Sequence, residues 1–271
     1  MKNLFDDKEF RKVISRYKKK GVPTELAERI YTSRLLGSNS KLVLHGGGNT
    51  SVKGQILDID NVIHNVIYIK GSGSDLASID VSGFPAVKLD PLVNFVKMDK
   101  VSDEQMVNFL RKNLIVHDSP NPSVETLVHA IIKEKYVDHT HSNAILEISN
   151  RPNGRILLNK LFHKKFIIIP YVMPGFLLSK KVFEEYKKNK NIHGLILCNH
   201  GIFTFADKAK RSYDLMIKAV NTAEKYLKNE KVKNISLVKK NKIKFDISYV
   251  SALLKSELCN NKDYIINFRS N

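Results

Sequence analysis

The sequence predicts an α/β domain in which helices cover a β-sheet, and three observations support this fold class. Segments with helical periodicity alternate with short runs rich in β-branched residues. The 271 residues are 42% hydrophobic and 27% charged, which is ordinary for a globular protein with a sizeable core. No internal repeat and no linker rich in Pro, Gly or Ser divides the chain. We therefore expect one domain over residues 1–230, followed by a C-terminal extension over residues 231–271.

The hydrophobic pattern assigns a type to each element in order. Periodicity near 3.6 residues predicts helices at 5–20, 24–36, 102–114, 123–135, 143–149, 152–163 and 207–229. Short β-prone runs predict strands at 51–53, 56–59, 66–70, 136–141, 166–169, 194–198 and 202–205. The extension is rich in Lys and Asn, with a β-like run at 244–250 and a helix expected at 251–258.

The charge balance is strongly basic. The chain has 45 Lys and Arg against 27 Asp and Glu, a formal net charge of +18. Such an excess occurs in proteins that bind nucleic acid, anionic lipid or small anionic substrates. The lysines, however, are spread over every amphipathic segment and are not interleaved with aromatic residues, as they are in single-strand binders. We interpret the charge as a solvated basic surface, and nucleic-acid binding is the less favoured alternative.

The N-terminus and the cysteine content predict a soluble, cytoplasmic protein. The first ten residues, MKNLFDDKEF, place three acids where a secretory signal needs an apolar run. The most apolar stretch, 166–178, contains two prolines and is too short to span a bilayer. The two cysteines, Cys198 and Cys259, are too few for a disulfide framework and fit a reducing compartment.

Two histidines in the predicted strand 136–141 are candidate metal ligands. His139 and His141 are two residues apart, so a strand directs both imidazoles to one face, roughly 6.6 Å apart along its axis. Two imidazoles on one face can converge on a single ion, as zinc and similar metals require. A packed or surface role is the alternative for each histidine.

A third histidine, His200, follows the apolar run 194–198 in the sequence Asn199-His200-Gly201. At the end of a buried strand it is placed to face a pocket at the edge of the sheet. Taken alone, it fits a structural turn histidine better than a ligand. With His139 and His141 it completes a three-histidine site with an open coordination position, the arrangement of catalytic zinc.

An acidic residue, Glu125, lies near the start of the predicted helix 123–135. Ser123 is the expected N-cap, so Glu125 falls in the first turn, where the helix dipole favours a carboxylate. Glu125 is therefore an ordinary first-turn acid, a fourth metal ligand or a general base. His129 lies four residues on, on the same helix face, and we expect it to support the site rather than bind the metal.

Two glycine-rich segments, 45–51 (HGGGNTS) and 70–75 (KGSGSD), are candidate phosphate-binding loops. Glycines let successive backbone N–H groups turn towards one concavity, and the neighbouring hydroxyl and amide side chains add donors. Neither segment has the spacing of a P-loop or of a dinucleotide fingerprint. Tight hairpin turns are the alternative for both.

The order of these motifs resembles that of the class II aldolase/adducin family. The strings HGGGNTSVK, IKGSGSDL, VDHTHSNA, IPYVMPGF and CNHGIFTF are most similar to one branch of it. That branch is the aldolase half of the bifunctional rhamnulose-1-phosphate aldolase/alcohol dehydrogenase proteins. The resemblance extends from residue 24 to residue 227.

The resemblance implies a three-layer α/β/α fold on a mostly antiparallel sheet, and a homotetramer with active sites at subunit interfaces. It implies zinc or another divalent metal ion on His139, His141 and His200, with Glu125 as a ligand in the resting site and as general base in turnover. The implied reaction is the reversible cleavage of a ketose 1-phosphate to dihydroxyacetone phosphate and a short aldehyde such as lactaldehyde. The family's phosphate-binding positions carry over to Asn49, Ser72, Gly73 and Ser123.

The chain departs from the family pattern in two places. Related sugar-phosphate aldolases often have a second Ser where this chain has Val124, so one phosphate hydrogen bond is missing. The proton-donating Tyr that some members lend from a neighbouring subunit has no counterpart, since Tyr171 belongs to a different motif. In the bifunctional relatives a dehydrogenase half follows, and the extension 231–271 is expected to correspond to the start of that continuing region.

Two alternative functions remain from the same resemblance. One is a sugar-phosphate epimerase or dehydratase that uses the same metal site. The other is a non-catalytic, adducin-like interaction module. Epimerases of the family place Asp at the position of Glu125, and adducins lack the three histidines, so the aldolase interpretation is preferred.

Overall fold

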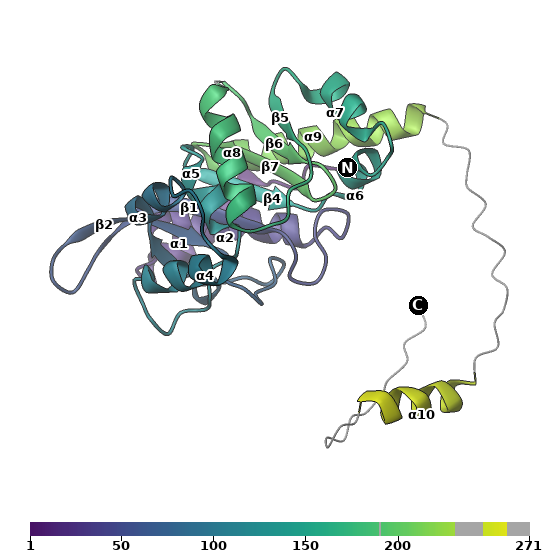
Figure 1. Ribbon diagram of the computed structural model, residues 1–271. Helices are drawn as coiled ribbons and strands as arrows, with labels where there is room; N and C mark the ends of the chain where they lie inside the picture. The colour runs from purple at the N-terminus through teal and green to yellow at the C-terminus, as the bar shows by residue number, and fades with distance from the viewer. Residues whose placement is uncertain (190, 231–245, 259–271) are drawn as a thin grey trace. The chain divides into compact units, whose positions relative to one another are not determined.

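Seven strands form one mixed sheet in the order β3-β2-β1-β4-β7-β6-β5 (Figure 1). The computed structural model describes residues 1–189, 191–230 and 246–258, and the chain separates into two units, 1–230 and 231–271. Only β5 and β6 pair in parallel, and the other described pairs are antiparallel. The strands are β1 (Asn49–Leu57), β2 (Ile63–Ile69), β3 (Ala86–Lys88), β4 (Tyr136–Thr140), β5 (Phe166–Ile169), β6 (Gly194–Leu197) and β7 (Gly201–Ala206).

Helices cover both faces of this sheet, which confirms the predicted three-layer α/β/α fold with a mostly antiparallel centre. One face packs against α1 (Asp7–Lys18), α2 (Thr24–Gly37), α6 (Asn143–Ser149), α7 (Gly154–Phe162) and α9 (Ala209–Asn229). The other face packs against α3 (Leu89–Phe95), α4 (Asp103–Lys112), α5 (Thr126–Ile131) and α8 (Phe176–Lys188). Strand β4 shows the alternation, because Tyr136 packs in the first layer and Val137 in the second.

Local capping sequences fix where several helices begin. The Asp6 side chain accepts hydrogen bonds from the backbone N–H groups of Lys8 and Glu9 and so starts α1. Ser102 and Gln105 form a reciprocal capping box at the start of α4. The helices expected at 5–20, 24–36 and 102–114 are therefore confirmed, with small differences at their ends.

The antiparallel pairing brings the glycine loops and the histidines to one edge of the sheet. Asn49 at the start of β1 pairs with His139 near the end of β4. Leu197 at the end of β6 pairs with Gly201 at the start of β7. Since β2 ends opposite Ser51, residue 70 lies at this edge as well. Motifs that are far apart in the sequence thus meet at one end of the sheet.

The prediction of separate strands at 51–53 and 56–59 was wrong, because β1 runs without a break from Asn49 to Leu57 through Gly54. A Cβ atom on Gly54 would lie 3.0 Å from Glu25 Oε1 and 3.1 Å from Tyr68 Cε2. Gly54 therefore leaves room for the close approach of Glu25 and Tyr68 and does not end the strand.

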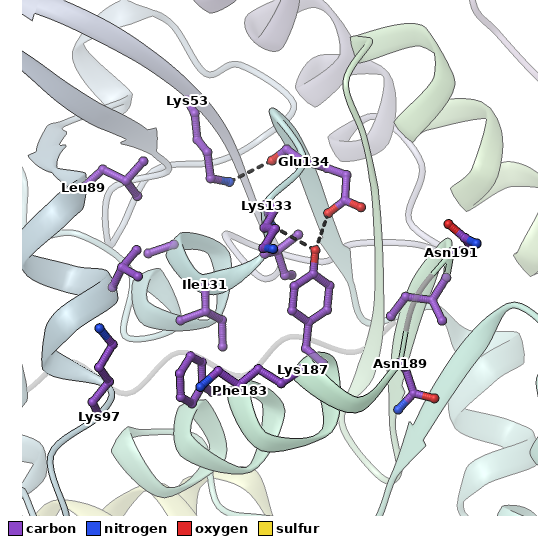
Figure 2. A pocket seen from close by; sticks show the side chains of 15 residues that line it. Lys53, Leu89, Lys97, Ile131, Lys133, Glu134, Phe183, Lys187, Asn189 and Asn191 are labelled. Carbon is purple, nitrogen blue, oxygen red and sulfur yellow. Dashed lines mark hydrogen bonds between the residues drawn. The ribbon is translucent and has the colours of Figure 1, made fainter.

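The helix prediction at 123–135 was also wrong in extent, because α5 has only six residues, Thr126–Ile131, and its N-cap is Glu125 rather than Ser123. The chain before α5 is held extended, since Ser123 N–H donates to Lys70 O at 3.3 Å and Ser72 N–H donates to Asn121 O at 2.7 Å. The short α5 leaves a pocket between α3 and α8, at the end of α5 remote from Glu125 (Figure 2).

Other elements carried weaker signals. β3, α3 and α8 were not expected from the sequence. In the second unit, α10 (Ile247–Leu258) overlaps the run 244–250 that is predicted to be β-like. That prediction was wrong at 247–250, and residues 244 and 245 lie outside the described residues. No helix in the described ranges is long and apolar enough to cross a membrane.

A buried ion pair fixes the orientation of β4. Arg29 of α2 and Asp138 of β4 are both fully buried, and the guanidinium lies 2.5 Å from Asp138 Oδ1. Ser212 of α9 donates a hydrogen bond to Asp138 Oδ2. Because successive side chains of a strand alternate, Asp138 faces α2 and α9 while His139 faces the α5 side of the sheet.

Candidate active site

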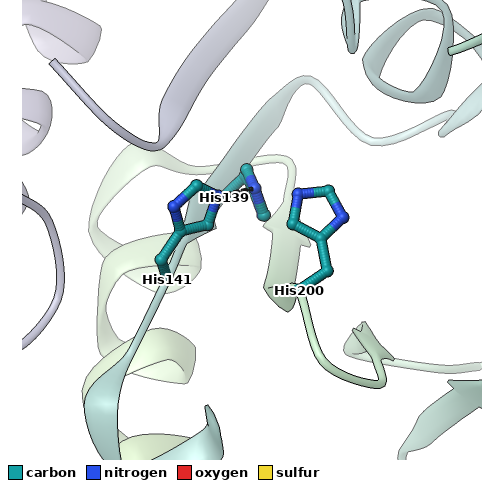
Figure 3. A group of neighbouring side chains, drawn as sticks. All are labelled: His139, His141 and His200. Atoms are coloured by element: carbon teal, nitrogen blue, oxygen red, sulfur yellow. Dashed lines mark hydrogen bonds between the residues drawn. The ribbon is translucent and has the colours of Figure 1, made fainter. Parts of the chain in front are cut away.

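Three histidines converge at the common edge of the sheet (Figure 3). His139 lies on β4, His141 directly follows β4, and His200 directly precedes β7. One ring nitrogen from each of the three lies within 4.8 Å of the others, and the Nε2 atoms of His139 and His141 are 3.0 Å apart. The sequence-based prediction that these residues meet is confirmed in its geometry.

Glycine and a left-handed residue allow this convergence. Asn199 has a φ of 59°, which turns the chain between β6 and β7 and places His200 beside β4. A Cβ atom on Gly201 would lie 2.5 Å from Thr140 O and 2.9 Å from His139 Cε1. The two strands can approach this closely only because position 201 has no side chain.

The histidines are held in the form that binds metals. Burial lowers the pKa values of His139, His141 and His200, so the neutral imidazoles are favoured. His139 Nδ1–H donates to Ile202 O at 3.2 Å, which leaves Nε2 as the unprotonated nitrogen directed at the cluster. Phe203 stacks on the His139 ring at a centroid distance of 4.1 Å and fixes its plane. This donor set fits a zinc-type ion.

Glu125 is buried between two of these histidines. Its Oε2 lies 3.3 Å from His139 Nε2, and its Oε1 lies 3.3 Å from His200 Nε2. Within the described residues, Oε1 accepts no hydrogen bond. Burial raises the pKa of Glu125, against the opposing effects of His200, Asn49 and Lys70. A buried carboxylate oxygen without a partner, facing imidazole nitrogens, is what a cation or a transferable proton would satisfy.

A chain of hydrogen bonds orients Glu125. The Ser51 hydroxyl donates to His129 Nδ1 at 2.8 Å, and His129 Nε2–H donates to Asn49 Oδ1 at 2.5 Å. Asn49 Nδ2 then donates to Glu125 Oε2 at 2.7 Å and to Ser123 Oγ at 3.0 Å. This amide orientation and tautomer satisfy every donor in the chain. His129 therefore contacts Asn49 and reaches Glu125 through it, without touching a ligand histidine.

Lys70 is a residue of this site that the sequence reasoning did not single out. Its side chain is buried, and Nζ donates to Gly46 O at 2.7 Å, which joins the two glycine-rich loops. Burial lowers the pKa of Lys70, while Asp75 and Glu125 act to raise it. The positive charge of Lys70 in turn acts on Glu125 and His141. The signal for Lys70 in the sequence was its position between a β-prone run and a Gly-rich turn.

The loop that carries Ser72 and Gly73 lies beside Ser123. Residue pair Gly71 and Pro122 forms an isolated β-bridge, and both Ser72 and Gly73 are exposed. Gly73 has a φ of 83°, a conformation that favours glycine. The sequence predicts four phosphate-binding residues: Asn49, Ser72, Gly73 and Ser123. In the structure they come from two neighbouring segments and from the start of β1.

The fold agrees with comparisons to known proteins. The Class II Aldolase and Adducin N-terminal domain family matches residues 27–227. The chain belongs to this family. The three-histidine cluster of this chain is a candidate metal site of the kind found in class II aldolases.

Individual relatives show the same kinship. The chain is 36% identical over 206 residues to the uncharacterized oxidoreductase YuxG of Bacillus subtilis (strain 168). The matched region spans 76% of this chain but only 30% of that protein. It is similar to the N-terminal class II aldolase domain of a conserved protein from Thermoplasma acidophilum, with 40% identity, a TM-score of 0.71 and coverage of 75% and 93% of the two chains. A sugar-phosphate aldolase from Thermotoga maritima shares the fold, with 16% identity, a TM-score of 0.55 and coverage of 81% and 95%.

Proposed function

We propose that the chain is a metal-dependent aldolase that reversibly cleaves a ketose 1-phosphate to dihydroxyacetone phosphate and a short aldehyde such as lactaldehyde. The observation that carries the proposal is the buried Glu125 carboxylate facing a three-histidine cluster at 3.3 Å. YuxG, which is named as an oxidoreductase and is much longer than this chain, supports one further point. We infer from it a kinship with the aldolase half of the bifunctional rhamnulose-1-phosphate aldolase/alcohol dehydrogenase proteins.

The metal would be held by His139, His141 and His200, with Glu125 as a further ligand when substrate is absent. A divalent ion there supplies Lewis-acid polarisation of the substrate's carbonyl and adjacent hydroxyl oxygens. The neutral imidazoles and the free Oε1 of Glu125 are the features of this chain that favour such an ion.

Glu125 would move the proton at the carbon where the bond forms or breaks. Its raised pKa brings the carboxyl closer to neutral pH, which suits a group that must both accept and return a proton. Asn49 holds Oε2, so Oε1 is the oxygen left to face the substrate. The chain therefore provides one oriented base on the face of the site that the histidines leave open.

A phosphate group would bind at the two glycine-rich loops. The Gly73 backbone N–H and the hydroxyl groups of Ser72 and Ser123 offer neutral donors, since the Ser72 N–H is already donated to Asn121 O. Lys70 adds a buried positive charge between the loops. Asn49 was also assigned to phosphate, but both of its amide hydrogens are donated to protein groups in the structure. We therefore propose that the phosphate depends mainly on the loop donors and on Lys70.

The active unit is proposed to be a cytoplasmic homotetramer without nucleic-acid or membrane partners. Support comes from exposed apolar side chains in the loop after β5 and in the first turn of α8, at the same sheet edge as His200. Tyr171, Met173 and Leu177 are 53%, 64% and 67% exposed. Burial of such side chains against another subunit removes apolar surface from water. Sedimentation of the purified protein tests the assembly.

The experiment that tests the reaction uses metal-loaded protein, dihydroxyacetone phosphate and a panel of short aldehydes, with identification of the products. We expect a carbon–carbon bond to form, and Glu125→Gln to lower turnover by about 10²–10⁴-fold. Epimerised or dehydrated sugar phosphate without new carbon–carbon bonds would identify the alternative enzyme class. Wild-type protein that neither holds metal nor turns over sugar phosphate would favour the adducin-like module.

A further inference from the structure

A pocket lies on the α5 side of the sheet, between α3 and α8 (Figure 2). Its volume is about 800 Å³, within the range of about 300–1,000 Å³ that is usual for small-molecule sites. It exists because α5 ends after six residues, so α3 and α8 flank an unfilled space. Its lining shares no residue with the candidate active site, among the residues that the structure describes.

The pocket combines an apolar floor with a basic rim. The floor is formed by aliphatic and aromatic side chains from α3, α5 and α8, including Leu89, Val93, Ile131 and Phe183. The rest of the lining carries three lysines on three segments, Lys97, Lys133 and Lys187. Its one acid, Glu134, accepts a hydrogen bond from the Tyr186 hydroxyl at 2.7 Å. A floor and rim of this kind suit a molecule with an apolar body and an acidic group.

Lys53 places an amine inside the pocket, where it comes from the middle of β1. Its Nζ donates to Glu134 O at 2.8 Å and to His129 O at 3.2 Å, near the end of α5. These two bonds have a structural purpose, since the last carbonyl groups of a helix lack partners within the helix. An ammonium group has three donors, so one remains for a ligand.

We propose that this pocket binds a small amphipathic anion, whose apolar body lies on the floor and whose carboxylate, sulfonate or phosphate group pairs with Lys53. Charge favours this occupant, because the Lys53 amine and the three rim lysines all attract an anion.

The charge state of Lys53 adds a pH signature. Burial lowers its pKa to about 7, with Glu134 and Asp207 acting in the opposite direction. A bound anion favours the ammonium form, so affinity is highest below this pKa and falls as pH rises through it. The other groups that face Lys53 across the pocket are the charged Lys97, Lys133 and Lys187, and Tyr186, whose pKa is raised by burial.

The test measures fluorescence on binding of anilinonaphthalene sulfonate, with the uncharged N-phenylnaphthylamine as the matched probe. We expect Lys53→Met to weaken binding of the sulfonate by about tenfold or more and to leave the uncharged probe unchanged. Leu89→Trp, which fills the floor and keeps Lys53, should weaken both probes. Between about pH 6 and about pH 9 the sulfonate should lose affinity and the uncharged probe should not.

Two control variants locate the bound probe. Lys12→Met removes an exposed lysine of α1, and His141→Ala disables the candidate active site, so both should bind the sulfonate like the wild type. The second control makes this result independent of the proposed aldolase activity. Equal binding of both probes, or wild-type binding by both Lys53→Met and Leu89→Trp, would overturn the proposal. So would probe binding that appears only when subunits dissociate, because the pocket would then be a subunit interface.

Discussion

Asn49 and His139 are direct partners in the antiparallel register of β1 and β4. This register places the Asn49 amide between Glu125, at 2.7 Å, and His129, at 2.5 Å. The strand pairing, and not the helix that follows Glu125, therefore sets the direction of its carboxylate towards His139 and His200. Glu125 is the N-cap of α5, but its side chain makes no capping hydrogen bond, so the carboxylate depends on this lateral support.

Replacement of Asn49 by Ala should reduce both stability and turnover. The substitution leaves Glu125 Oε2 and His129 Nε2 buried without their partner, and each unpaired group costs about 1–3 kcal/mol. Denaturant unfolding measures the loss. Asn65→Ala, on the exposed part of β2, is the control and should change stability by less than about 0.5 kcal/mol. Equal stability of the two variants would show that the hydrogen-bond chain does not hold Glu125.

One divalent ion per chain should co-purify with the protein. The three histidine nitrogens lie within 4.8 Å of one another, so removal of one ligand by His141→Ala should remove most of the metal. Elemental analysis of protein prepared without chelator measures the stoichiometry. His163→Ala, at an exposed histidine after α7, should keep the full amount. A metal content that is near zero in the wild type contradicts the site.

Metal affinity should stay nearly constant down to unusually low pH. Burial lowers the pKa values of His139, His141 and His200, so these ligands are already deprotonated where ordinary histidines, with a pKa of about 6.5, begin to protonate. Protons compete with the ion only as pH falls through the lowered values. Competition with a chromophoric chelator at a series of pH values measures this. A steep loss of affinity already above about pH 7 would argue for exposed ligands.

Replacement of Gly201 by Ala should disturb the metal ligands directly. The added Cβ would lie 2.9 Å from His139 Cε1 and 3.1 Å from His141 Cδ2, so both rings must move. We expect metal affinity to fall by about tenfold to hundredfold, as when other groups that orient ligands are changed. Gly21→Ala is the control. Its φ of 75° makes the substitution strained, and the residue lies after α1 rather than beside the histidines. It should lose stability and keep metal affinity.

The sequence allowed the residues of the candidate site to be predicted more completely than the helices and strands around them. The prediction that His139 and His141 share one face required only a strand, in which every second side chain points the same way, and that strand exists as β4. His200 and Glu125 lie far from them in the chain, and it was the order of the motifs that grouped the four residues. Their actual contacts depend on the register of β1 with β4 and of β6 with β7, which no local pattern encodes.

The remaining differences come from interactions between distant segments. Gly54 looks like a strand break, yet it permits close packing of Glu25 and Tyr68. Ser123 looks like an N-cap, yet its backbone pairs with Lys70, and the helix starts later. Arg29 gave no signal, because a charged residue in a predicted amphipathic helix looks exposed until its partner, here Asp138 of β4, is known. In each case a tertiary contact outweighs the local preference.

Replacement of Lys70 by Met should reduce selectivity for a phosphorylated donor. Lys70 is buried between the two glycine-rich loops, so its loss would remove the charge-assisted hydrogen bond that we propose it makes to phosphate. We expect kcat/KM for dihydroxyacetone phosphate to fall by about tenfold to hundredfold, while that for unphosphorylated dihydroxyacetone changes little. Lys70 also acts to lower the pKa of Glu125, so its removal should move the acidic limb of the pH–rate profile to higher pH. Lys12→Met, on α1, should leave both quantities unchanged. An equal fall for both donors, with no movement of the acidic limb, would mean that Lys70 only holds the loops together through Gly46.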